Sequence, residues 1–177
     1  MNKLTFYAKL SGLVFAAALL AACSGNDTKE QEAAAEDAAV EQEAAQQAAA
    51  AAASEKQARV EAQQVLETAA SDMGTVFYFD FDSSSLTDEA RAQVDAHIAA
   101  LMGNNASVRL EGHTDERGTR EYNLALGERR ANAVRDYMVA NGVPGYRIES
   151  ISYGEENPVA YGSGESNWQQ NRRVELK

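Results

Sequence analysis

The composition of the chain changes abruptly at Met73, and this break limits where a globular core can form. Residues 24–72 are mostly Ala, Glu and Gln, with eleven acidic and three basic residues, no Pro and no aromatic residue. Such a segment has too little apolar surface to offset the entropy lost when it is ordered in a core. Because Ala, Glu and Gln are good helix formers, we expect a flexible, partly helical tether over residues 23–72. The folded domain is then predicted to occupy residues 73–177.

The first 22 residues have the layout of a bacterial secretory signal peptide. Lys3 and Lys9 flank the start of an apolar run over residues 10–20, which ends in small residues before Cys23, the single cysteine of the chain. The run is too short to span ~30 Å of hydrocarbon, which takes about 20 apolar residues. We therefore predict that residues 1–22 are removed on export. Cleavage of an ordinary signal peptide would leave Cys23 as a free thiol, which is a liability in an oxidising compartment. The alternative is that Cys23 is modified.

The chain is acidic, and this excludes several kinds of partner. Its formal net charge is −11, and removal of the two lysines in residues 1–22 takes the net charge to −13. The sequence has no basic stripe for nucleic acid and no polybasic patch for anionic lipid. Attachment to a membrane therefore depends on a covalently bound lipid.

From Met73 on, the sequence predicts alternating strands and helices. Phe77, Phe79 and Phe81 recur at every second position and are expected on one face of a first strand. The elements expected in chain order are a strand at residues 76–81, a helix between residues 87 and 103, a strand at 108–112, a helix at 121–141, a strand at 148–153, a loop at 154–171 and a strand at 174–176. This order predicts an α+β fold, a two-layer βαβαβ(β) sandwich with helices on one face of a mixed sheet. Right-handed crossover connections would make the first two strands parallel.

Three polar features of the domain are not typical of packing. Residues 112–118, Gly-His-Thr-Asp-Glu-Arg-Gly, follow a strand, and α/β sheets usually bind ligands at the carboxyl ends of strands. Arg130 is spaced by four from Leu126 and Val134, so it lies in or beside the apolar stripe of its helix and needs an anionic partner. Residues 80–82, Asp-Phe-Asp, end the first strand. If the first two strands are parallel, these residues lie at the same edge of the sheet as the Asp115 loop.

An acidic side chain and an arginine at the same edge of the sheet could together bind a zwitterionic ligand. The carboxylate of Asp115 would bind an ammonium group, and the guanidinium of Arg130 would bind a carboxylate through two parallel hydrogen bonds. The alternative is that Asp115 and Arg130 form a structural ion pair with each other. The residue types alone do not decide between these two interpretations.

Metal binding and catalysis are weaker interpretations of the same loop. His113 and Asp115 are two candidate ligands, and with only His97 elsewhere they fall short of the three or four that a zinc site needs. No Ser or Cys nucleophile stands beside a base in a recognisable motif. We therefore expect no metal, no cofactor and no catalytic residue. Trp168 is interpreted as a core or rim aromatic residue that could help to bind a partner.

Residues 111–134 resemble the signature of OmpA-like peptidoglycan-binding domains, in particular those of peptidoglycan-associated lipoproteins. The similarity includes Tyr-Asn at residues 122–123, Leu-Gly-Glu-Arg-Arg-Ala at 126–131, Ser-Tyr-Gly at 152–154 and Asn-Arg-Arg at 171–173. It covers roughly residues 76–176. The resemblance implies a pocket that holds the diaminopimelate of the peptidoglycan stem peptide. By motif position, Asp115 takes its ammonium group and Arg130 its carboxylate, and the other lining residues are Arg117, Leu126, Phe81 and Asp82.

Residues 20–23, Leu-Ala-Ala-Cys, resemble the lipobox of bacterial lipoproteins. This resemblance implies that Cys23 carries a diacylglyceryl group and an acylated amine, and that Ser24, where an inner-membrane lipoprotein has Asp, directs the protein to the outer membrane of a Gram-negative bacterium. The domain would then face the periplasm and join outer membrane to cell wall. The resemblance further implies the Tol–Pal system, with TolB as partner and a role in cell division. The alternatives are an envelope enzyme that acts on peptidoglycan and the wall anchor of another envelope machine.

Cys23→Ser should leave the protein as an unprocessed or soluble precursor, because a hydroxyl group cannot replace the thiol in the lipid transfer. Fractionation of cells into membrane and soluble material measures this. Full recovery of the substituted protein in the outer-membrane fraction would contradict lipid anchoring at Cys23.

Overall fold

The computed structural model describes residues 28–177, with side chains from residue 40 onwards. The predicted signal peptide and Cys23 lie outside the described residues. Contacts divide the chain into two units, and the domain belongs to the unit Ala51–Lys177. Within residues 28–177, no helix is both long enough and apolar enough to cross a membrane.

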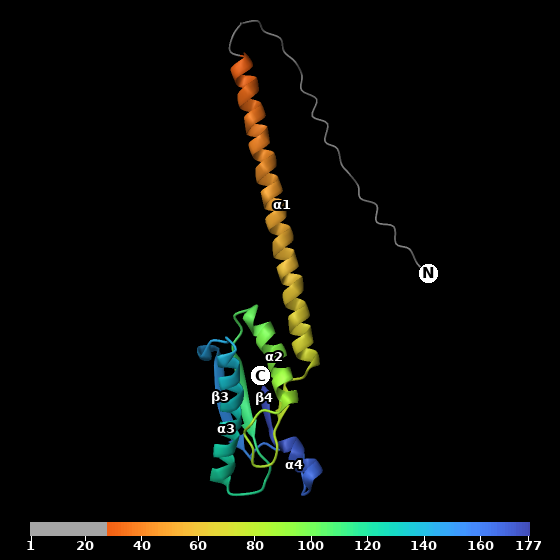
Figure 1. Ribbon diagram of the computed structural model, residues 1–177, viewed down its shortest axis with the longest axis vertical. Helices are drawn as coiled ribbons and strands as arrows, with labels where there is room; N and C mark the ends of the chain where they lie inside the picture. Colours follow the sequence, from red (N-terminus) through yellow and green to blue (C-terminus); the bar gives the residue numbers. More distant parts are fainter. Residues whose placement is uncertain (1–27) are drawn as a thin grey trace, which may run out of the picture. The chain divides into compact units, whose positions relative to one another are not determined.

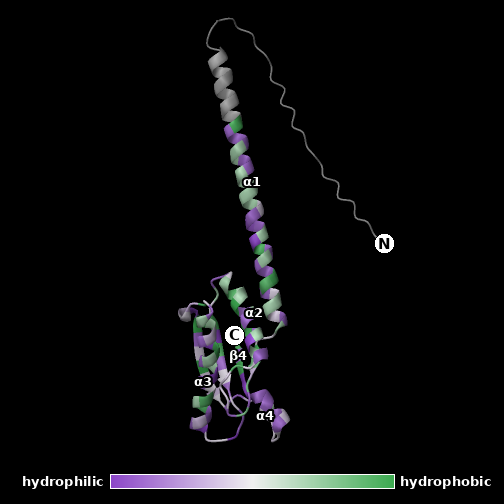
Figure 2. Cartoon of the chain, in the orientation of Figure 1, coloured by the Kyte–Doolittle hydropathy of each residue, from purple (hydrophilic) through white to green (hydrophobic). Residues whose placement is uncertain are grey.

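The segment that we expected to be a partly helical tether contains helix α1, Thr28–Asp72. From residue 40 onwards, hydrophilic and hydrophobic residues are interspersed along it without a continuous apolar stripe (Figure 2). Its last turns nevertheless contact the domain, because Gln63 Nε2 donates to the carbonyl of Ala100 at 2.8 Å and Ala70 is buried. The compact unit that holds the domain therefore begins before the composition break at Met73, and a domain boundary at that residue stays a prediction.

The domain has the predicted α+β order of elements, and the fold class is confirmed (Figure 1). Its elements are β1 (Val76–Tyr78), α2 (Asp88–Met102), β2 (Val108–His113), α3 (Arg120–Ala140), η1 (Gly145–Arg147), β3 (Ile148–Gly154), α4 (Glu165–Asn171) and β4 (Arg173–Leu176). The strand order in the sheet is β1-β4-β2-β3, with β4 antiparallel to both of its neighbours and β2 parallel to β3. Strands β1 and β2 therefore run in the same direction, as predicted, although β4 lies between them.

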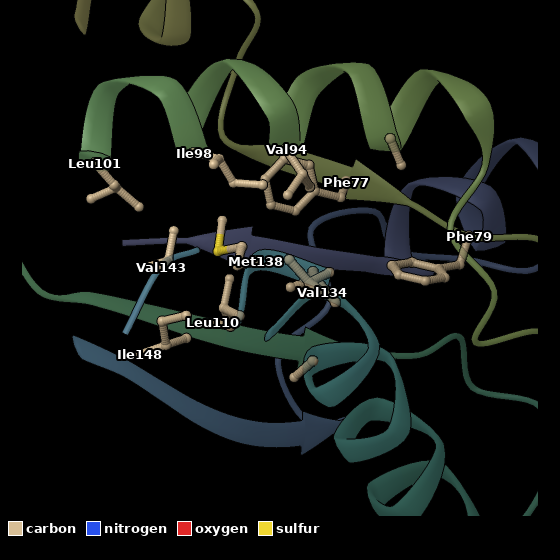
Figure 3. Close-up of a cluster of buried hydrophobic side chains, with 13 residues drawn as sticks. Phe77, Phe79, Val94, Ile98, Leu101, Leu110, Val134, Met138, Val143 and Ile148 are labelled. Atoms are coloured by element: carbon tan, nitrogen blue, oxygen red, sulfur yellow. The ribbon is translucent and has the colours of Figure 1, made fainter. Parts of the chain in front are cut away.

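The hydrophobic core lies between the sheet and helices α2 and α3 (Figure 3). The strands contribute Phe77, Leu110 and Val174, all wholly buried. Val94 from α2 and Met138 from α3 pack against them from the helical layer. Because β1 and β2 both pair antiparallel with β4, the segments that follow these two strands lie at one edge of the sheet.

Two local predictions are wrong. Strand β1 ends at Tyr78, because the chain turns at residues 80–83 with Asp82 at a positive φ of 53°, so Phe81 is 59% exposed instead of joining the buried face of Phe77 and Phe79. The predicted loop at residues 154–171 ends in helix α4. The amide of Asn171, the last residue of this helix, bonds to backbone groups of residues 159 and 160, and these contacts hold the short helix against the loop.

Strand β2 and helix α3 approach most closely at two glycines. A Cβ atom on Gly112 would lie 2.0 Å from the carbonyl oxygen of Gly127, and one on Gly127 would lie 2.4 Å from Oγ of Ser152. All three nearest neighbours of a Cβ atom on Gly112 are backbone atoms of Gly127, so no flexible group there can move aside. The two glycines therefore allow α3 to lie directly against the end of β2, where the polar loop begins.

Gly112→Ala should lower the free energy of unfolding by about 1–3 kcal/mol, because the added methyl group overpacks this crossing. Gly145→Ala is the matched control, since a Cβ atom there meets its nearest neighbour, Val139, at an ordinary 3.6 Å. Denaturant unfolding of both variants measures the difference. Equal stability of the two variants would contradict a tight crossing.

Candidate functional site

A cavity of about 220 Å³ opens at the edge of the sheet where β1 and β2 end. Its lining residues are Phe81, Asp82, Thr114, Asp115, Arg117, Gly118, Tyr122, Asn123, Leu126 and Arg130. All six residues that the sequence assigned to a ligand pocket are in this set, so the structure brings them together. Their roles in binding stay predictions.

Three chain segments form the cavity. The turn after β1 supplies Phe81 and Asp82, the loop after β2 supplies the four lining residues between 114 and 118, and α3 supplies the four between 122 and 130. Helix α3 begins where Thr119 Oγ1 accepts a hydrogen bond from the backbone of the third residue beyond it, which is a standard N-cap.

The guanidinium group of Arg130 is wholly buried and joins these three segments. Its Nε, Nη1 and Nη2 atoms donate to the carbonyl oxygens of Ser83 (2.8 Å), His113 (2.9 Å) and Asp80 (3.1 Å). Arg130 therefore lies in the apolar stripe of its helix as predicted, but its partners are backbone carbonyls and not the expected anion. Burial lowers the pKa of Arg130 to about 10, so it remains charged at neutral pH.

Two hydrogens of this guanidinium, one on Nη1 and one on Nη2, have no acceptor among the described residues. A pair of this kind can bind one carboxylate in bidentate fashion. Because Arg130 lines the cavity, these are the hydrogens that a bound anion would use.

Asp115 is 4% exposed and its ion pairs are with Arg117 and Arg172. Arg117 donates from Nε to Oδ1 at 3.1 Å and from Nη2 to Oδ2 at 2.6 Å, and its backbone N–H also donates to Oδ1. Burial alone would raise the pKa of Asp115, but the hydrogen bonds from Arg117 and Arg172 outweigh it and hold the pKa below its usual value. The alternative of a structural ion pair between Asp115 and Arg130 is therefore wrong.

Sequence reasoning missed Arg172, which is buried beside the site. It donates to the carbonyl of Phe79 at 3.1 Å, lies 3.4 Å from Asp115 Oδ2, and pairs with Glu165 at 2.6 Å. The Asn-Arg-Arg run was a usable signal, but its position depends on α4, which the sequence did not predict. Tyr122 was also missed, and its hydroxyl bonds to Asp82 across the cavity mouth.

Arg117 lies between two aromatic rings. Its guanidinium carbon is 4.0 Å from the ring centre of Phe81 and 4.2 Å from that of Trp168. The indole N–H of Trp168 donates to Glu116 Oε1 at 3.2 Å. The exposed ring of Phe81 therefore packs against Arg117 at the surface and not in the core.

His113 does not line the cavity. Its ring is buried and stacks on Tyr153 with 5.6 Å between ring centres, and neither ring nitrogen has a hydrogen-bond partner among the described residues. Burial lowers the pKa of His113 to about 4, so the ring is neutral at neutral pH. Among side chains 40–177, no three His, Cys, Asp or Glu residues gather closely enough to hold a metal ion.

The chain is similar to proteins of one family. The OmpA family model matches residues 78–172, more than half of the chain. A protein of Pseudomonas aeruginosa named Peptidoglycan-associated lipoprotein is 59% identical over 103 residues, which are 58% of this chain and 61% of that protein. A protein of the same name from Pseudomonas putida is 57% identical over 111 residues, 63% of this chain and 67% of that one. The matched region thus spans only about three-fifths to two-thirds of these relatives.

The chain is also similar to a solved structure of a protein with the same name as these relatives. The crystal structure of the peptidoglycan-associated lipoprotein from Burkholderia pseudomallei matches with a TM-score of 0.57 and 46% sequence identity. The match covers 58% of this chain and 87% of that one.

His113→Phe should remove a stability loss that the native protein shows as pH falls from 6.5 to 4. In this window the unfolded histidine takes up a proton and the folded one does not, so acid favours unfolding. Denaturant unfolding measures the free energy of unfolding at about pH 7 and about pH 4.5. Between these two values, His113 should lower the free energy of unfolding of the native protein by about 2 kcal/mol, and the variant should lack this decrease. Because both proteins share all other titrating groups, equal losses would contradict a neutral buried His113.

Proposed function

Because this chain belongs to the OmpA family, we propose that it is an outer-membrane lipoprotein whose periplasmic domain binds peptidoglycan non-covalently and is not an enzyme. The names of its relatives at 57–59% identity support this proposal. Cys23 would carry the lipid, and residues 23–72 would connect it to the domain. The Tol–Pal system, with TolB as partner and a role in envelope integrity and constriction at division, follows from the same family membership as a further part of the proposal.

The ligand group that fits the cavity is the zwitterionic end of diaminopimelate. One observation carries this assignment: a buried carboxylate and a buried guanidinium, both charged, line one small cavity. The two hydrogens of Arg130 without a protein acceptor would bind the ligand carboxylate, and Asp115 would bind its ammonium group. The apolar faces of Leu126 and Phe81 would contact the methylene chain between the two ends of the ligand.

Asp115→Asn should weaken binding to purified peptidoglycan sacculi by about tenfold or more, because a charge-assisted hydrogen bond is worth about 1.5–3 kcal/mol. The matched control is Asp136→Asn, which removes an exposed carboxylate on α3 outside the cavity. Pull-down with sacculi, with and without free meso-diaminopimelate as competitor, measures binding. Native-level binding by Asp115→Asn, or failure of free diaminopimelate to compete, would contradict the proposed ligand.

Arg130→Ala is a less specific test of the same site. It removes the donor from three carbonyl groups at once, so the variant should melt early whatever the ligand is. Thermal melts of every variant therefore accompany the pull-downs, and binding is compared only in folded protein.

A further inference from the structure

Arg117 occupies the place on Asp115 that a ligand's ammonium group would take. It bonds to both carboxylate oxygens through its side chain and again through its backbone N–H. Arg172 also contacts the carboxylate, and Asp115 is 4% exposed. An incoming cation therefore reaches Asp115 only when the Arg117 side chain leaves it.

The aromatic rings of Phe81 and Trp168 both contact the guanidinium group of Arg117 and hold it in this position. Trp168 is fixed in turn by its hydrogen bond to Glu116. Helix α4 supplies Trp168, and it also supplies Glu165, whose carboxylate lies 3.8 Å from Arg117 Nη2. The side chain of Arg117 is 30% exposed, so it has room to turn outward.

We propose that Arg117 is an internal competitor of the ligand, and that Trp168 is the positioning residue that keeps it on Asp115. This inference rests on the function proposed above. When the ligand binds, its ammonium group replaces Arg117 on Asp115, and the released guanidinium turns away from the indole ring. Asp115 is paired before and after the exchange, so no buried charge is left without a partner.

The exchange predicts that loss of a side chain at the site increases the affinity for the ligand. The apparent dissociation constant equals the intrinsic one divided by the fraction of protein in the open state. Loss of the Trp168 ring should therefore strengthen binding, because it destabilises the closed state. A residue that simply supports the pocket would weaken binding when it is removed.

Trp168→Ala should bind free meso-diaminopimelate about two- to 30-fold more tightly than the native chain, the range expected for loss of one cation–π contact. Trp168→Phe keeps an aromatic ring and should bind much like the native chain. Calorimetric titration of the three proteins, each checked by thermal melting, measures this. Equal or weaker binding by Trp168→Ala overturns the inference and leaves the proposed function standing.

The indole ring also reports the exchange directly, because Trp168 is the only tryptophan in the sequence. Saturation of the native chain with meso-diaminopimelate should change its tryptophan emission, and Arg117→Gln should show no such change. Binding that is seen by calorimetry without a change in native emission overturns the inference. If the native chain binds neither diaminopimelate nor sacculi, the proposed function fails, and the inference fails with it.

Discussion

The geometry of the site depends on the buried guanidinium group of Arg130. A charge with no exposed surface is costly unless hydrogen bonds offset the loss of water. Here three backbone carbonyls, from the turn after β1 and from the end of β2, provide that compensation. Each bond to the charged group contributes about 1.5–3 kcal/mol, so one side chain of α3 fixes both strand ends relative to the helix. The cavity exists because these three segments meet around it.

The charges around the cavity fit a ligand that carries both signs. The chain as a whole has a net charge of −11, yet three arginines surround the buried carboxylate of Asp115. A simple anion would use only the two hydrogens of Arg130 that have no acceptor among the described residues, and a simple cation would use only Asp115. A zwitterion can take Asp115 with one end and Arg130 with the other. Such a ligand enters without leaving a buried charge unpaired, and removal of one partner from a buried pair is strongly destabilising.

The sequence predicted features that follow from local pattern and general topology. The order of elements, the parallel direction of β1 and β2 and the OmpA resemblance are confirmed. What it could not predict depends on residues far apart in the chain. Phe79 N–H still bonds to the carbonyl of Arg172, 93 residues away, and the turn at residues 80–83 then takes the chain out of the strand. Arg172 reaches Asp115 only because α4 brings the chain back to the site. Backbone carbonyls have no sequence signature, so the sequence predicted an anionic partner for Arg130 where the structure has three carbonyl oxygens.

The three arginines at the site differ in how firmly the backbone holds them. Arg130 is wholly buried and bonds to three carbonyls, whereas Arg172 bonds to one carbonyl and to two carboxylates. Among the described residues, the Arg117 side chain bonds to no carbonyl, and it is also the most exposed of the three. Movement of Arg130 would leave buried carbonyls without donors, but movement of Arg117 breaks side-chain contacts with two carboxylates and two aromatic rings. Two arginines therefore have different roles. Arg130 holds the strand ends and the helix in place, whereas Arg117 can leave Asp115 without a change in the fold.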